Sequence, residues 1–188
     1  MPTEIKNIGD FNSIKPTYDS GKHKNRHYFT KKMSLSGDAI NSRELLLFNN
    51  DLSIYKSFIN NNMNYLYRNS HFDELIYIQS GKATFSSNFG FLNLIPGDYL
   101  VIPKGVIWKI DVEENLSCLL VESSSPIEVP GKYTNRFGQF MEHSPFCERD
   151  IVTPTFQDPV LESNIELKIR LEGGIQDYTL RNHPFDIV

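Results

Sequence analysis

The sequence is poor in cysteine and in long apolar runs. Its 188 residues include two cysteines, Cys118 and Cys147, which lie far apart and do not suggest a disulfide framework. No apolar run approaches the length of a membrane span, and the first thirty residues lack the apolar segment of a secretory signal. We therefore expect a cytoplasmic protein that does not span a membrane.

An excess of positive charge is also missing. The net charge is -4 and the isoelectric point is about 5.7, which argues against nucleic acid or an anionic membrane surface as a partner. Basic residues concentrate only between Lys22 and Lys32, and we interpret this group as a solvated surface. A chain of this length can still bury the core of one domain.

Short apolar segments separated by turn residues fill the middle of the chain. Asn49-Asn50-Asp51 and Asn60-Asn61-Asn62 are typical breaks between strands. Segments this short and this closely spaced predict an all-β sandwich or barrel. The predicted strands are 44–48, 52–55, 64–68, 74–79, 82–86, 90–94, 99–102, 108–112 and 117–122, and a further alternating segment covers 167–171.

Two glycines are expected to have positive φ. Gly81 separates two predicted strands, and a positive φ there would permit a tight hairpin. Pro96-Gly97-Asp98 predicts a type II turn, because proline presets φ at the second position and glycine supplies the positive φ at the third.

The spacing of these residues resembles the two motifs of the cupins. Glu74 and Gly81 match the end of the first motif, and the segment from Gly97 to Trp108 matches the second motif up to its last position. The resemblance implies a double-stranded β-helix, or jelly-roll barrel. Cupins hold a divalent metal with two histidines and a glutamate from the first motif and one histidine from the second, and imidazole suits such metals.

The histidines of those motifs are missing here. The stretch 67–70 before Glu74 reads Tyr-Arg-Asn-Ser, and the last position of the second motif is Trp108. His71 is a poor substitute, since residues three apart on a strand point to opposite faces. Only Glu74 remains of the ligand set. We predict that this chain has no metal ligand, no cofactor-binding residue and no catalytic residue.

Other side chains leave alternatives open. A facial triad could combine His71 and His143 with Glu142 or Glu148, but loop histidines without ligand spacing are more often hydrogen-bonded surface groups.

Two further groups have a chemical and a structural interpretation. Cys147 with His143 could form a thiol nucleophile and base, although the fold and not sequence proximity pairs such groups. Glu74 could act as a general base with a raised pKa. We favour a buried ion pair between Glu74 and Arg68.

Four segments, 67–75, 96–105, 135–151 and 183–188, form an ordered series along the chain. The series resembles the bacterial homogentisate 1,2-dioxygenases, and the likeness extends from about residue 40 to the end. The resemblance implies a two-cupin protein that uses O₂ to open the ring of homogentisate to maleylacetoacetate, in tyrosine and phenylalanine catabolism. It also implies that Fe(II) and the catalytic residues lie in the C-terminal cupin, whereas the N-terminal cupin, to which this chain corresponds, is metal-free.

We divide the chain into an N-terminal arm (1–40), a cupin barrel (41–126) and a connecting segment (127–188) that leads toward an absent second cupin. The leading hypothesis is a scaffold that lacks the iron site and is inactive alone. Its partners would be a second cupin domain and further copies in a homo-oligomer. The alternatives are a stand-alone, metal-independent cupin that binds a small molecule or a partner, and a cupin enzyme with a rearranged metal site.

Overall fold

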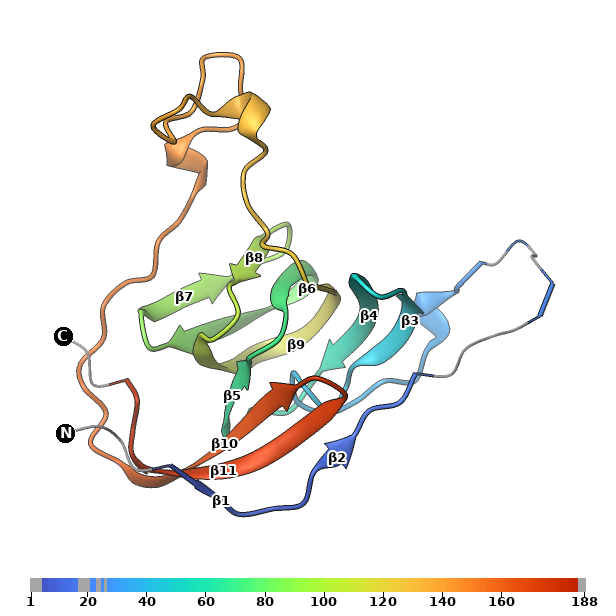
Figure 1. Ribbon diagram of the computed structural model, residues 1–188, viewed down its shortest axis with the longest axis vertical. Helices are drawn as coiled ribbons and strands as arrows, with labels where there is room; N and C mark the ends of the chain where they lie inside the picture. Colours follow the sequence, from blue (N-terminus) through green and yellow to red (C-terminus); the bar gives the residue numbers. More distant parts are fainter. Residues whose placement is uncertain (1–4, 17–20, 23–24, 26, 186–188) are drawn as a thin grey trace.

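The computed structural model in Figure 1 describes residues 5–16, 21–22, 25 and 27–185 and consists almost entirely of β-strands, as the sequence predicts. The strands are β1 (Ile5–Asn7), β2 (Asn12–Ser13), β3 (Glu44–Phe48), β4 (Leu52–Ile59), β5 (Leu66–Asn69), β6 (Asp73–Ser87), β7 (Gly90–Leu94), β8 (Tyr99–Ile102), β9 (Ile107–Ser123), β10 (Ser163–Leu171) and β11 (Gly174–Asn182). Three single 3-10 turns complete the elements: η1 (Thr30–Lys32), η2 (Gly131–Tyr133) and η3 (Glu148–Asp150). No helix in the described part of the chain is long and apolar enough to cross a membrane.

Two long strands, β6 and β9, build the barrel by passing through both of its layers. Their first and last halves pair with different neighbours. One layer has the order β3-β4-β9-β6-β8, and the other has the order β1-β11-β10-β5-β9-β6-β7. This is the two-layered cupin barrel that the motif spacing predicts.

Gly81 lies where β6 bends from one layer into the other. Its φ is +90°, which confirms the predicted positive φ, but the predicted hairpin is wrong because Gly81 lies inside a continuous strand. The register between β6 and β9 shifts on both sides of this glycine, as in a β-bulge. A Cβ at Gly81 would clash with the backbone oxygen of Asn115 on β9. The predicted strands 108–112 and 117–122 are likewise one strand, β9.

The predicted type II turn before β8 is confirmed. The N–H of Asp98 donates to the carbonyl of Ile95 at 3.2 Å, and Gly97 at the third position has a φ of +100°. The Asp98 carboxylate also accepts a hydrogen bond from the Ile95 N–H at 2.9 Å. The turn fixes the direction in which β8 joins β6.

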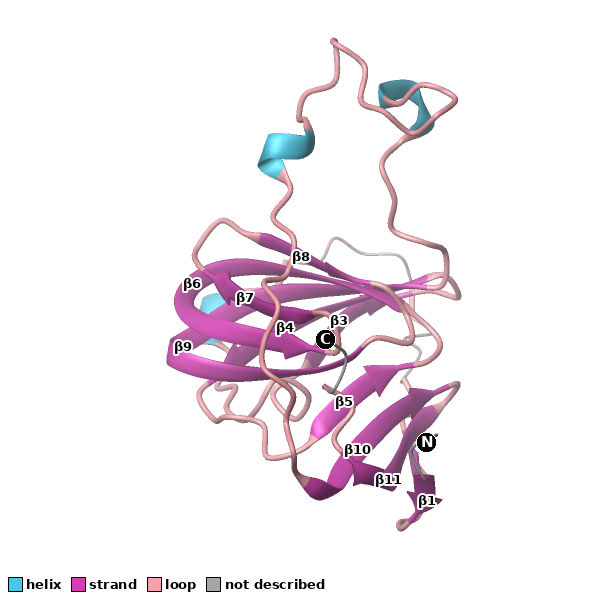
Figure 2. Cartoon of the chain, turned by 90° about the vertical axis from the view of Figure 1, so that its left-hand side faces the viewer, coloured by secondary structure: helices cyan, strands magenta, loops and turns pink. Residues whose placement is uncertain are grey.

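The ends of the described chain extend the second layer of the barrel (Figure 2). β10 pairs in parallel with β5, β11 returns antiparallel to β10 through a tight turn, and β1 pairs antiparallel with β11. The segments interpreted as an arm and as a connecting segment therefore both contribute strands. The basic group 22–32 and the terminal 183–188 motif lie partly outside the described residues.

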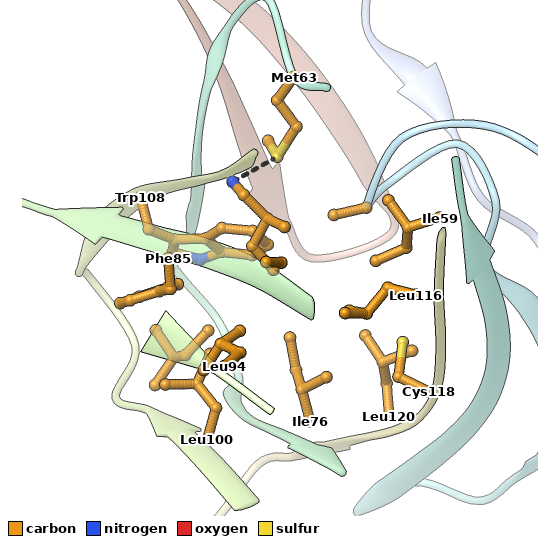
Figure 3. Packing of buried hydrophobic residues seen from close by; sticks show 14 of the residues in the cluster. Ile59, Met63, Ile76, Phe85, Leu94, Leu100, Trp108, Leu116, Cys118 and Leu120 are labelled. Atoms are coloured by element: carbon orange, nitrogen blue, oxygen red, sulfur yellow. Dashed lines mark hydrogen bonds between the residues drawn. The ribbon is translucent and has the colours of Figure 1, made fainter. Parts of the chain in front are cut away.

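Two apolar clusters fill the molecule. The larger one lies inside the barrel and surrounds Trp108, which is fully buried (Figure 3). The smaller one lies on the opposite side of β5, and it consists of Leu66, Leu167, Ile169, Leu180 and Phe185. Successive residues of β5 point to opposite faces, so Leu66 belongs to one cluster and Tyr67 to the other.

Residues 127–162 form a long excursion between β9 and β10 (Figures 1 and 2). Its first part projects away from the barrel, and its last part returns along the barrel, where Thr155 pairs with Phe91 of β7 and the Val160 N–H donates to the Phe185 carbonyl. It contains η2 and η3 and has its own small aromatic cluster, in which the rings of Tyr133 and Phe140 both pack on Phe146. Backbone bonding between Thr134 and Phe140 closes its tip. We call this segment the projecting loop.

The bend at Gly81 gives a stability prediction. Gly81→Ala should lower the free energy of unfolding by about 2–4 kcal/mol, because positive φ and a backbone clash act together. Gly105→Ala is the matched control: φ is +94° there, but nothing lies within 4 Å of its Cβ position. It should cost only the φ strain of about 1 kcal/mol. Urea unfolding of both variants measures the difference. Equal losses of unfolding free energy would show that the clash with Asn115 contributes nothing.

Candidate functional site

Aromatic side chains occupy the barrel interior where the cupin motifs place histidines. Trp108, at the last position of the second motif, is fully buried and lies opposite Tyr67 in the β5–β9 ladder. Their rings meet edge to face with centroids 5.2 Å apart, and the Phe85 ring lies 5.8 Å from Trp108 on another side. Trp108 therefore packs against two aromatic rings, and within the described residues its buried indole nitrogen has no hydrogen-bond partner.

Glu74, the one residue kept from the ligand set, forms a buried ion pair with Arg43. Arg43 Nη1 lies 2.6 Å from Glu74 Oε1, and the two side chains are 7% and 1% exposed. The Arg43 Nε donates to the Ala39 carbonyl at 2.9 Å, and its guanidinium lies over the Tyr67 ring, 5.4 Å from the centroid. The guanidinium therefore supplies the positive charge beside Glu74.

The predicted pair between Glu74 and Arg68 is wrong. Glu74 shares the interior face of β6 with Ile76 and Ile78. Arg68 lies between two interior residues of β5, Tyr67 and Asn69, and so points to the opposite face of the strand. Arg43, just before β3, takes the place that the sequence interpretation gave to Arg68.

Glu122 of β9 adds a second carboxylate to the interior. Its Oε1 lies 3.4 Å from Arg43 Nη1 and accepts a hydrogen bond from the Asn69 amide at 3.2 Å. Its Oε2 accepts a hydrogen bond from the Tyr55 hydroxyl at 2.8 Å. Residues from β4, β5, β6 and β9 thus converge on one guanidinium, and we call Arg43, Tyr55, Asn69, Glu74 and Glu122 the interior cluster.

Burial governs the protonation of this cluster. Burial raises the pKa of Glu74, and the Glu122 charge raises it further, whereas Arg43 lowers it. Burial and Glu122 together raise the pKa of Tyr55 to about 12, so its hydroxyl keeps its proton and donates to Glu122. Arg43 stays protonated, because its pKa is raised by both carboxylates despite its burial.

The interior cluster does not fit the iron that the resemblance implies for the longer protein. Histidine is absent from it, and a guanidinium already pairs with its best carboxylate ligand. Across the described ranges, no three His, Cys, Asp or Glu side chains lie close enough to hold a metal ion. The Glu74 Oε2 and the Arg43 Nη2 have no hydrogen-bond partner in this part of the chain. The cluster therefore pairs one guanidinium with two carboxylates and offers no histidine ligand for iron.

The structure does not bring the alternative site residues together. His71 is an exposed residue whose ring packs on Phe72, with centroids 4.6 Å apart. His143 lies in the projecting loop, exposed, and its Nε2 contacts the Lys132 carbonyl at 3.2 Å.

The carboxylates and the thiol of the projecting loop form no site with these histidines. Glu142 and Glu148 are exposed. Cys147 begins η3, where its N–H donates to the Asp150 carboxylate at 2.9 Å. Neither the facial triad nor the thiol nucleophile is assembled in the described residues.

Most of the interior cluster was not predicted from the sequence, although the burial of Glu122 could have been. Leu116, Cys118 and Leu120 alternate along a strand, so Glu122 continues a buried row. A buried carboxylate requires a cation or a hydrogen-bond donor. Arg43 carries no comparable signal, because it precedes a strand and is joined to Glu74 only by the fold.

Comparison with known proteins places the chain in a family. Residues 19–132 match the model for the N-terminal domain of homogentisate 1,2-dioxygenase. The chain belongs to this family. A curated relative from Saccharolobus solfataricus, named as a putative dioxygenase, is 35% identical over 190 residues, which cover 100% of this chain and 49% of the relative. The chain thus spans about half the length of that relative.

Solved cupin structures resemble part of the chain. A cupin-2 domain protein from Shewanella frigidimarina is 21% identical over 44% of this chain and 79% of its own, with a TM-score of 0.40. An RmlC-like cupin from the same organism is 16% identical over 54% of this chain and 93% of its own, with a TM-score of 0.44.

The interior ion pair gives a second stability prediction. Arg43→Met should lower the free energy of unfolding by about 3–5 kcal/mol, because Glu74 and Glu122 are left buried without a cation. Lys82→Met is the control: it breaks an exposed pair with Glu114 and should cost less than about 1 kcal/mol. Adding Glu74→Gln and Glu122→Gln to Arg43→Met should recover part of the loss. Urea unfolding that shows similar small losses for both single variants would contradict the account.

The raised pKa of Glu74 predicts how stability depends on pH. The folded protein holds this proton at pH values where the unfolded chain has released it, so stability falls as pH rises from about 4.5 through the raised pKa. Glu74→Gln removes this contribution. The variant should therefore gain stability relative to the natural chain as pH rises through that window, as measured by urea unfolding at a series of pH values. Parallel curves would show that the pKa of Glu74 is the same in both states.

Proposed function

We propose that this chain is the N-terminal, metal-free cupin portion of a homogentisate 1,2-dioxygenase-type protein. Its role is to pack against a second cupin, which holds Fe(II) and opens the ring of homogentisate to maleylacetoacetate in tyrosine and phenylalanine catabolism. The interior cluster is the observation that carries the proposal, because Arg43 pairs with the residue that a metal-binding cupin would use as a ligand. The family match and the greater length of the curated relative support it.

The outer face of the first barrel layer supports a role in packing. Along β4, β9, β6 and β8, the residues that alternate with the barrel interior form an apolar row. The row consists of Ile54, Val121, Leu75 and Val101, and Tyr77 stacks on Tyr99 beside it with ring centroids 4.6 Å apart. Val101 is 42% and Tyr99 is 67% exposed. A continuous apolar face on a sheet is typical of a surface that another domain covers.

The projecting loop presents further apolar side chains to solvent. Phe137, Val152, Phe156 and Leu161 are all more than 70% exposed, and none of them belongs to either apolar cluster. A loop of this length that holds its own conformation is well suited to reach a neighbouring domain or subunit. We infer that the second cupin and further copies of the chain contact these surfaces in the complete protein.

Metal content and oxygen uptake test the proposal. The 188-residue chain, reconstituted anaerobically with Fe(II), should hold no stoichiometric iron and should consume no O₂ when homogentisate is added. The longer relative from Saccharolobus solfataricus is the matched control, since its other half is available to supply the second cupin. It should bind iron and consume O₂ with homogentisate.

Two outcomes would contradict the proposal in different ways. Stoichiometric iron with turnover in the 188-residue chain would show that this barrel is itself catalytic, with ligands that His71 or His143 supply after rearrangement. Iron without homogentisate-dependent O₂ uptake in the longer relative would show that the assigned substrate is wrong.

A further inference from the structure

A cavity of about 640 Å³ lies on the outer face of the first barrel layer, beneath the segment that contains η1. Its wall combines residues from this segment with residues from β4, β6 and β9. The lining residues used below are Lys31, Met33, Lys56, Phe58, Gln79 and Ser117. The volume falls within the range of small-molecule sites. The interior cluster lies on the other face of the same strands, so this cavity is separate from it.

Lys56 places a buried positive charge in this cavity. The residue is only 6% exposed, and its Nζ donates to Gln79 Oε1 and Ser117 Oγ, both at 2.6 Å, and to the Cys118 carbonyl at 3.3 Å. All three of its N–H groups therefore have neutral acceptors.

The charge of Lys56 is not balanced by an acid. No carboxylate in the described chain forms an ion pair with it, although Glu44 lies opposite Lys56 in the β3–β4 ladder. Burial lowers the pKa of Lys56, and an anion in the cavity would oppose that shift. Lys31 on η1 adds a second cation from the facing side of the cavity.

The rest of the cavity suits the body of an organic molecule. Phe58 projects from β4 on the same face as Lys56, two residues away, and the facing segment supplies the apolar side chains of Met33 and Leu35 beside Thr30 and Lys31. A lining that combines charged, polar and apolar groups orients a ligand that has one charged end and an apolar body.

We propose that this cavity binds a small organic carboxylate, with its carboxylate beside Lys56 and Ser117 and its apolar body against Phe58 and Met33. The Ser117 hydroxyl accepts from Lys56 and donates to Gln79 Oε1 over a long 3.4 Å, a bond that it can exchange for one to the carboxylate. The site requires neither iron nor the second cupin, so it is independent of the function proposed above.

Benzoate is the probe, and benzamide is the uncharged control compound. Titration of the full 188-residue chain with benzoate should shift the backbone amide NMR signals of Lys31, Met33 and Ser117, whereas benzamide should bind at least about tenfold more weakly because it lacks the charge. Equal binding of both compounds, or no saturable shift with benzoate, would overturn the proposal. Inorganic phosphate is titrated in a separate experiment. If phosphate binds and benzoate does not, the cavity is a general anion site and the proposal is overturned.

Lys56→Met tests the role of the cation while it keeps most of the side-chain volume. Benzoate binding should weaken at least about tenfold in this variant. Lys82→Met, which removes an exposed lysine of β6 outside the cavity, should bind as the natural chain does. Natural affinity in Lys56→Met would contradict the proposal. Should Lys56→Met fail to fold, the comparison of benzoate with benzamide on the unaltered chain decides the question alone.

Discussion

Arg43 enters the barrel interior and forms an ion pair with Glu74, and the burial of carboxylates in this interior depends on that contact. A buried carboxylate without a cation costs several kcal/mol, and cupins of the metal-binding kind meet that requirement with a metal ion. Here the guanidinium meets it, and Tyr55 and Asn69 satisfy the second carboxylate, Glu122. Trp108 and Tyr67 fill the volume that the histidine side chains would otherwise line.

The groups that pair inside this barrel all belong to the chain itself. The positive charge beside Glu74 is part of the chain and cannot dissociate, while Glu74 Oε2, Arg43 Nη2 and Trp108 Nε1 are buried without a hydrogen-bond partner in the described residues. Exposed apolar side chains lie outside, on the face around Val101 and Tyr99 and on the projecting loop.

The sequence predicted the barrel well because its signals are local. The turn at Gly97 and the short strands follow from φ preferences and from alternation over a few residues.

The errors come from long-range geometry. A glycine at a strand bend and a glycine in a hairpin need the same positive φ, so Gly81 was assigned correctly in conformation and wrongly in topology. The prediction paired Glu74 with Arg68, which lies on the wrong face of β5. Its actual partner, Arg43, lies just before β3. β11 was missed because polar residues such as Gln176 occupy its buried positions.

Anaerobic equilibrium unfolding in the presence of excess Fe(II), and again with a chelator, tests most directly whether Arg43 has replaced the metal. A metal that binds only the folded state stabilises it by RT ln(1 + [L]/Kd), which is about 2.7 kcal/mol at a hundredfold excess over Kd. If Arg43 takes the place of the metal, the free energy of unfolding is the same in both conditions. A clear increase with Fe(II) would show that the folded chain has an iron site, and it would contradict the replacement of the metal by Arg43.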